Sequence, residues 1–107
     1  MTDPNLAQAL RRRADIVAAW LVTPAVAGAP ARLGVAYAAD RAPTHYEMYD
    51  DLPGELARVL GGDLEVVDLS RAAAAMVRSV TTDGAVVFER HAGTAQAWLA
   101  ARTSTGA

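Results

Sequence analysis

The side chains of this sequence that could hold a metal ion or move a proton are a few scattered acids and two histidines. Glu65 and Asp68 lie in a short apolar segment, LEVVDL, and Glu65 is expected to be an exposed acid on one face of a strand. His45 and His91 lie far apart without a partner at metal-ligand spacing, so we expect surface or half-buried histidines. Ser70 has no histidine in its motif that could activate it as a nucleophile. Metal binding by oxygen ligands around Glu65 is the chemistry that remains to be tested.

Two runs of charge have simpler interpretations. Residues 47–55 predict an acidic helix face, which is usually solvated although it could attract a basic partner; its acids are Glu47, Asp50, Asp51 and Glu55. Arg11, Arg12 and Arg13 fall within one helical turn and point to different sides. We therefore expect them to form a solvated helix end that complements the helix dipole.

Composition limits the classes to which the protein can belong. The 107 residues allow one domain with one modest core, which we place at residues 1–102, with a flexible tail at residues 103–107. A net charge of −2, with ten arginines and no lysine, gives no basic face for nucleic acid. The absence of cysteine excludes a disulfide framework and a cysteine-ligated metal. The apolar run at residues 16–22 is too short to cross a membrane, so we expect a cytoplasmic domain with no membrane partner.

Four short runs rich in apolar residues predict strands, at residues 16–22, 33–37, 64–69 and 85–88. The first strand is expected to end at Thr23-Pro24, because proline has no N–H to donate to a sheet. Helices are expected to connect these strands. Asp3-Pro4 predicts the start of the first helix, and Ser70 is expected to cap a helix that ends near Asp83-Gly84. Thr94 could cap a last short helix that buries Trp98 and Leu99.

The helix that ends at Gly61-Gly62 has two possible starts. Pro53-Gly54 either kinks a helix that begins near Thr44 or marks a helix that begins only at Asp51, and the sequence leaves both open. Helical spacing predicts a buried stripe made of Tyr46, Tyr49, Leu52, Leu56, Val59 and Leu60. Tyr46, Met48 and Tyr49 could alternatively form an interaction surface, but at this spacing core positions are expected.

Residues 56–90 resemble the C-terminal half of a minimal nucleotidyltransferase, a small bacterial relative of the DNA polymerase β palm. In that family a leucine-rich helix leads into a VDLVDL-like strand, then an Arg/Ala-rich helix, then a G-x-L-L-Y-E-R-like strand. The segments GDLEVVDLSRA and DGAVVFER match this order. The resemblance implies an α+β fold in which helices flank a mixed sheet of three to four strands.

The resemblance also locates the family's active-site positions in this chain. The family uses a Gly-Ser turn to bind a triphosphate, and an Asp-x-Asp motif with a third acid to bind two Mg²⁺ ions. Thr23 and Pro24 stand at the Gly-Ser positions, and Pro30 and Arg32 stand at the two aspartates. Glu65 stands where the third acid is expected. The resemblance thus implies a site without catalytic residues, metal ligands or cofactor, because an arginine cannot replace a metal-binding carboxylate.

Three functions are compatible with these features. The first is a catalytically inactive domain that acts by protein–protein interaction, as the antitoxin-like partner of a HEPN-type ribonuclease, with a homo-oligomer also possible. The alternative is an active nucleotidyltransferase or nucleotide-binding protein in which Glu65 recruits Asp40 or Glu47 to hold Mg²⁺. A third is an interaction module whose resemblance to the family is only architectural.

The first hypothesis makes a geometric prediction about Arg32 and Glu65. If the second and third strands are neighbours, as the resemblance implies, both side chains should point to the same face. They would then form a salt bridge or hydrogen bond in place of a metal ion. A half-exposed pair of this kind would contribute only ~0–1 kcal/mol to stability.

Overall fold

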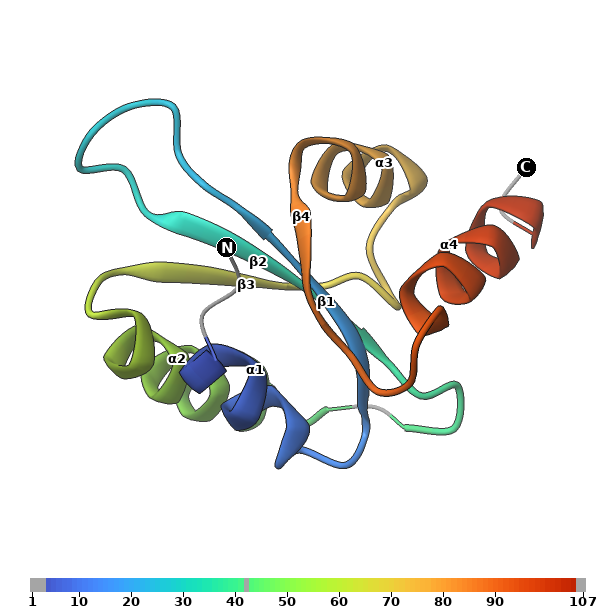
Figure 1. The fold of residues 1–107 in the computed structure, drawn as a ribbon, viewed down its shortest axis with the longest axis horizontal. Coiled ribbons are helices and arrows are strands. Elements are labelled where there is room, and N and C mark those ends of the chain that lie inside the picture. The colour runs from blue at the N-terminus through green and yellow to red at the C-terminus, as the bar shows by residue number, and fades with distance from the viewer. Residues whose placement is uncertain (1–3, 42, 106–107) are drawn as a thin grey trace.

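The computed structural model describes residues 4–41 and 43–105, which form a four-stranded sheet with helices on both faces (Figure 1). Helices α1 and α2 cover one face, and helices α3 and α4 cover the other. This arrangement confirms the expected α+β class with a flanked mixed sheet. The elements are α1 (Pro4–Arg11), β1 (Ile16–Val22), β2 (Ala31–Tyr37), η1 (Glu47–Asp51), α2 (Leu52–Leu60), β3 (Leu64–Asp68), α3 (Ala74–Asp83), β4 (Ala85–Glu89) and α4 (Thr94–Thr105).

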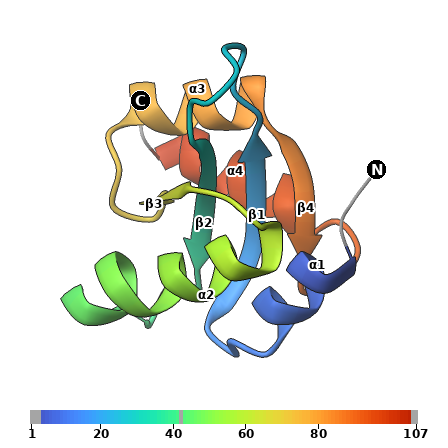
Figure 2. The same cartoon turned by 90° about the vertical axis from the view of Figure 1, so that its left-hand side faces the viewer.

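The strands lie in the order β3-β2-β1-β4 (Figure 2). Strand β1 pairs antiparallel with both β2 and β4, whereas β2 pairs parallel with β3. The four predicted strands are therefore present, and β2 begins at Ala31, two residues earlier than predicted. This extension matters for the site, because it brings Arg32 into the paired region of the sheet.

Alternating side chains of β2 supply both layers of the core. Leu33, Val35 and Tyr37 face the layer of α1 and α2, whereas Ala36 belongs to the layer of α3 and α4. Gly34 lies on this second face, where Leu69 and Val80 occupy the space above it. The period of two places successive residues on opposite faces, so both sides of this strand are buried.

A π-turn settles where the helix before Gly61 begins. The chain is helical from residue 45, the Thr44 hydroxyl accepts a hydrogen bond from the Glu47 N–H at 3.1 Å, and the wide turn η1 connects this start to α2. The Leu52 N–H bonds to the Glu47 carbonyl oxygen, five residues back, just before Pro53. A π-turn adds one residue to the helical repeat and accommodates the proline that lacks an N–H.

The predicted buried stripe on this helix is partly wrong for the same reason. Tyr46 and Tyr49 are 65% and 67% exposed, whereas Met48 is buried. Leu52 and Leu56 are fully buried as expected. Because the π-turn rotates the residues before it relative to α2, a stripe extrapolated back from Leu56 at regular spacing misses the buried side.

Ser70 does not cap a helix, which corrects another expectation. Helix α3 begins only at Ala74, and its N-cap residue Ala73 makes no side-chain hydrogen bond. The Ser70 hydroxyl instead accepts the N–H of Tyr37 at 2.9 Å. Asp68 forms a turn here, since its Oδ1 accepts the Ser70 N–H at 3.0 Å. Ser70 thus anchors the β3–α3 connection to the end of β2.

The predictions for the two ends of the chain can be compared with the structure only over the described residues. Pro4 opens α1 as expected, but Asp3 lies outside the described residues. Helix α4 starts at Thr94 and continues to Thr105, so part of the expected tail is helical, and residues 106–107 are not described. Trp98 packs against Trp20, with ring centroids 5.7 Å apart. Within the described part of the chain, no helix has the length and apolar character needed to span a membrane.

The buried phenol of Tyr37 predicts a loss of stability at alkaline pH. Tyr37 is 1% exposed, and burial, followed by the charges of Glu47 and Asp15, raises its pKa well above the ordinary value of 10. Above pH 10 the unfolded state releases this proton while the folded state retains it. The free energy of unfolding should therefore fall by up to about 1.4 kcal/mol per pH unit there.

Urea denaturation at pH 9, 10, 10.5 and 11 measures this slope. Tyr37→Phe should remove the part of the slope that belongs to Tyr37, while the exposed Tyr49 replaced by Phe serves as a matched control that leaves it unchanged. An identical alkaline slope in the Tyr37 variant would contradict the assignment.

Candidate functional site

Most of the five positions that the resemblance assigned to the family's active site lie together at the loop end of the β1–β2 hairpin. A small pocket of about 150 Å³ is lined there by Val22, Pro24, Pro30, Arg32 and Glu65. We call it the former-site pocket. Four of the five predicted positions line it, while Thr23 is exposed beside it in the loop at residues 23–30. Val22 is the lining residue that the sequence analysis missed, although as the last residue of β1 it directly precedes Thr23.

Strand register explains why these residues meet. Val22 lies opposite Arg32 in the β1–β2 pair, and Arg32 lies beside Glu65 in the β2–β3 pair. Neighbouring positions on adjacent strands project their side chains to the same face of a sheet. The two prolines flank the connecting loop, which Figure 1 shows projecting beyond the sheet between β1 and β2.

Arg32 and Glu65 form the predicted salt bridge. The Arg32 Nε lies 2.6 Å from Glu65 Oε1 and donates a hydrogen bond to it. The two side chains are 41% and 52% exposed, so the pair is screened by solvent and contributes only ~0–1 kcal/mol to stability. Its consequence is chemical, because the acid in the pocket already has a cationic partner.

The donor set of this pocket does not fit a Mg²⁺-bound triphosphate. Magnesium prefers several oxygen ligands, usually including one or two carboxylates. Among the described residues, Glu65 is the one acid that lines the pocket, and its Oε1 is bound to Arg32. Pro24 has no N–H with which to bind a phosphate oxygen. In the described residues, no group of three or more histidine, cysteine, aspartate or glutamate side chains could hold a metal ion.

The acids proposed as alternative ligands lie elsewhere. Asp40 follows the far end of β2, eight residues beyond Arg32, and five residues of strand already span roughly 16 Å. Glu47 lies near Arg13, with 3.9 Å between Oε2 and Nη1. Burial, followed by the charge of Asp15, raises the pKa of Glu47, while Arg13 opposes this rise. The structure therefore does not bring either acid to Glu65.

The acidic helix face attracts a basic partner from within the chain, because Arg13 is half-buried against it, whereas Arg11 and Arg12 are exposed as expected. Arg13 Nη2 lies 2.7 Å from Glu55 Oε1, and its Nη1 lies 3.2 Å from Asp51 Oδ2. Arg12 lies 3.5 Å from the other oxygen of Glu55. Burial alone would lower the pKa of Arg13, but the hydrogen bonds to Asp51 and Glu55 raise it. This network ties α1 to the helix that carries the acids.

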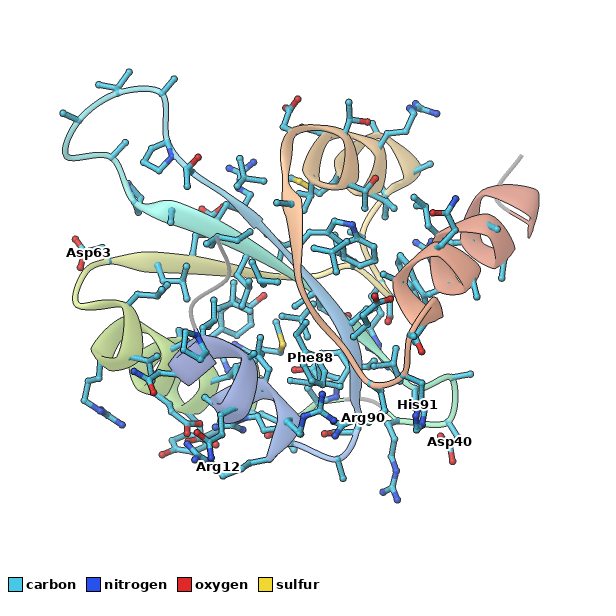
Figure 3. The ribbon with its side chains drawn as sticks, viewed as in Figure 1. Arg12, Asp40, Asp63, Phe88, Arg90 and His91 are labelled. Carbon is cyan, nitrogen blue, oxygen red and sulfur yellow. The ribbon has the colours of Figure 1, made fainter. Side chains whose placement is uncertain are left out.

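The histidines behave as expected from their spacing. His45 and His91 are both exposed, and the His45 ring contacts the Tyr49 ring with centroids 4.5 Å apart. Figure 3 shows His91 beyond the end of β4, next to Arg90. Neither histidine lines the former-site pocket.

No protein-family model matches this sequence, and no curated protein matches it. Solved structures do match over almost the whole chain. A mutant form of an MntA-containing toxin–antitoxin matches with a TM-score of 0.67 at 16% identity, covering 95% of this chain and 91% of the other. The toxin–antitoxin MntA–HepT matches with a TM-score of 0.62 at 16% identity, covering 94% and 89%.

A third match is to a Shewanella oneidensis structure, described as a tri-AMPylated HEPN toxin in complex with its MNT antitoxin. Its TM-score is 0.56 at 14% identity, covering 92% of this chain and 91% of the other. The chain has the fold of the minimal nucleotidyltransferase antitoxins. At such low identity the likeness concerns the fold, and it confirms the architecture implied by GDLEVVDLSRA and DGAVVFER. Within the minimal nucleotidyltransferase fold, the former-site pocket lies at the end of the first hairpin, where Pro24, Arg32 and Glu65 meet.

Proposed function

We propose that this protein is a catalytically inactive minimal nucleotidyltransferase that acts in the cytoplasm as the antitoxin-like partner of a HEPN-type protein. The observation that carries the proposal is the Arg32–Glu65 salt bridge at 2.6 Å in the former-site pocket. A guanidinium stands there in place of a metal-binding carboxylate and engages the remaining acid. The strands that frame the site are kept, but the site now presents a positive charge, which repels a metal cation.

Loss of nucleotide transfer leaves contact as the way to neutralise a partner. The matching structures are described as toxin–antitoxin pairs, one of them with an AMPylated HEPN toxin, which supports a partner of this class. The chain also offers apolar side chains for contact: Tyr46, Tyr49 and Val26 are 65–69% exposed. Exposed aromatic residues are enriched in protein interfaces.

Titration with ATP, with and without Mg²⁺, tests the catalytic part of the proposal. Isothermal titration calorimetry should show no binding that depends on Mg²⁺, because the pocket supplies one carboxylate and that carboxylate is paired. An active minimal nucleotidyltransferase serves as the positive control. Micromolar, metal-dependent binding of ATP that Glu65→Gln abolishes would overturn the assignment.

Arg32→Asp should fail to restore nucleotide transfer. The variant adds a carboxylate beside Glu65, but Pro24 still lacks the N–H and hydroxyl that would bind the triphosphate. Transfer of radiolabelled AMP to a HEPN protein is the measurement, and Arg78→Asp on the exposed side of α3 is the control for charge. If Arg32→Asp alone restored transfer, the turn at Thr23-Pro24 would be able to bind the triphosphate and the prediction would be wrong.

If a HEPN-type protein is encoded beside this chain, that protein tests the proposed partner directly. Co-expression should give a complex that survives size-exclusion chromatography and relieves toxicity, while intact-mass spectrometry shows no nucleotidyl group added to the partner. The same result is expected with Arg32→Ala, because contact does not require the pocket chemistry. A nucleotidylated partner would contradict action by contact. The absence of both a complex and relief of toxicity would contradict it as well.

A further inference from the structure

A second, larger cavity lies at the opposite end of β2 from the former-site pocket. Its volume is about 700 Å³, within the range of clefts that bind small molecules. The loop that follows β2, the β3–α3 turn and one side of α4 form its walls, together with Val17 of β1 and Tyr37 of β2. Its lining residues include Arg41, Ser70, Arg71, Thr94, Trp98 and Arg102. We call it the arginine cavity. No spacing in the sequence indicates it, because its walls come together only through the tertiary fold.

The charge of the arginine cavity favours an anion. Arg41, Arg71 and Arg102 line it, and none of its described lining residues is an acid. Asp68 partly offsets this charge from outside the lining, since its Oδ2 lies 2.6 Å from Arg71 Nη1. Figure 3 shows Asp40 at the tip of the loop after β2, directed away from the ribbon. Guanidinium groups bind phosphate oxygens well, because their planar fork of N–H donors matches the geometry of the anion.

Two of these arginines are held in place by backbone contacts. Arg71 Nη2 donates to the Arg41 carbonyl oxygen at 3.0 Å, and Arg102 Nη1 donates to the Ser70 carbonyl oxygen at 2.8 Å. A second nitrogen of Arg102 donates to the carbonyl of Ala72. Side chains that are already ordered lose less entropy when a ligand binds. Arg41 itself is exposed and lines the cavity.

Trp98 adds an aromatic side chain to the lining of the arginine cavity. The indole is half-buried, lines the cavity and packs against the buried Trp20 at a centroid distance of 5.7 Å. Aromatic faces bind flat rings by stacking, and this contact does not depend on the exact ring. The cavity therefore combines arginine side chains with an aromatic side chain in its lining.

We propose that the arginine cavity binds a small organic phosphate that carries a flat ring, such as a nucleoside monophosphate. Its phosphate lies against Arg41 and Arg71, and its ring lies on Trp98. This binding needs no metal ion and does not involve Arg32 or Glu65. It goes beyond the proposed function, because the ligand occupies a different end of the sheet.

Titration with AMP in EDTA tests the proposal on the full chain. Saturable binding is expected by calorimetry, together with a change in tryptophan emission, and rising salt should weaken it. Arg41→Gln should weaken AMP binding about tenfold, the loss of one charge-assisted contact. Arg78→Gln removes another exposed arginine, on α3 and outside the cavity, and should leave the affinity unchanged. Inorganic phosphate and adenosine should each bind more weakly than AMP.

Four outcomes would overturn the proposal. They are the absence of saturable AMP binding, an affinity that Arg41→Gln leaves unchanged, adenosine binding as tightly as AMP, and phosphate binding as tightly as AMP. Arg32→Gln separates the two sites. If this variant weakens AMP binding while Arg41→Gln does not, the nucleotide occupies the former-site pocket and the arginine cavity is not a binding site.

Discussion

Replacing Gly34 with alanine is expected to lower the free energy of unfolding by about 2–3 kcal/mol. A Cβ at this position would lie 2.6 Å from Val80 Cγ1 and 2.8 Å from Leu69 Cδ1. Such distances are too short for carbon atoms, so α3 or the β3–α3 connection would have to move away from the sheet. Both neighbouring side chains are fully or almost fully buried, which leaves little room to yield.

Urea denaturation followed by circular dichroism measures this effect. Gly62→Ala is the matched control, because a Cβ there meets no atom within 4 Å. Shortening the neighbour provides a second test: Val80→Ala should cost less in the Gly34→Ala background than in the wild type. Additive effects in this double-mutant cycle would show that the two positions do not compete for the same space.

The predictions from sequence succeeded where the spacing of apolar residues or the pairing of neighbouring strands determines the structure. The run at residues 16–22 forms β1 with the expected ends, since Pro24 cannot continue a sheet. The contact between Arg32 and Glu65 followed from the adjacency of two strands, because side-by-side residues share a face. The long-range contact between Arg32 and Glu65 could therefore be predicted from the resemblance to the family, which places β2 beside β3.

Predictions failed where tertiary contacts or a π-turn override the local preference for a helix cap or for regular helical spacing. Ser70 has the residue type of a helix cap, but its hydroxyl binds the Tyr37 backbone across the sheet and the helix starts four residues later. Tyr46 and Tyr49 were expected in the core, and the π-turn places Met48 there instead. Propensity is a weak guide when a hydroxyl or a turn has an alternative partner far away in the sequence.

Arg90→Ala should destabilise the fold by about 2–4 kcal/mol, because one guanidinium holds the connection between α1 and β1. Its Nη1 donates to the Arg11 carbonyl oxygen at 2.8 Å, and its Nη2 donates to the carbonyl oxygens of Arg13 and Ile16 at 2.7 Å each. Its Nε also donates to Ile16 at 3.2 Å, and the group lies 5.0 Å from the centre of the Phe88 ring. Figure 3 shows Arg90 and Phe88 close together at the lower end of β4.

Arg90→Lys separates charge from geometry in the same measurement. A lysine keeps the positive charge but cannot present a fork of donors to three carbonyl oxygens at once, so it should recover only a minor part of the loss. Arg78→Ala, an exposed arginine on α3, should change the free energy of unfolding by less than about 0.5 kcal/mol. If Arg90→Lys were as stable as the wild type, charge alone would suffice and the shared contacts to Arg11, Arg13 and Ile16 would not stabilise the turn. If Arg90→Ala were as stable as the wild type, neither the charge nor the hydrogen bonds of Arg90 would stabilise the fold. Packing alone would then join the end of α1 to the start of β1.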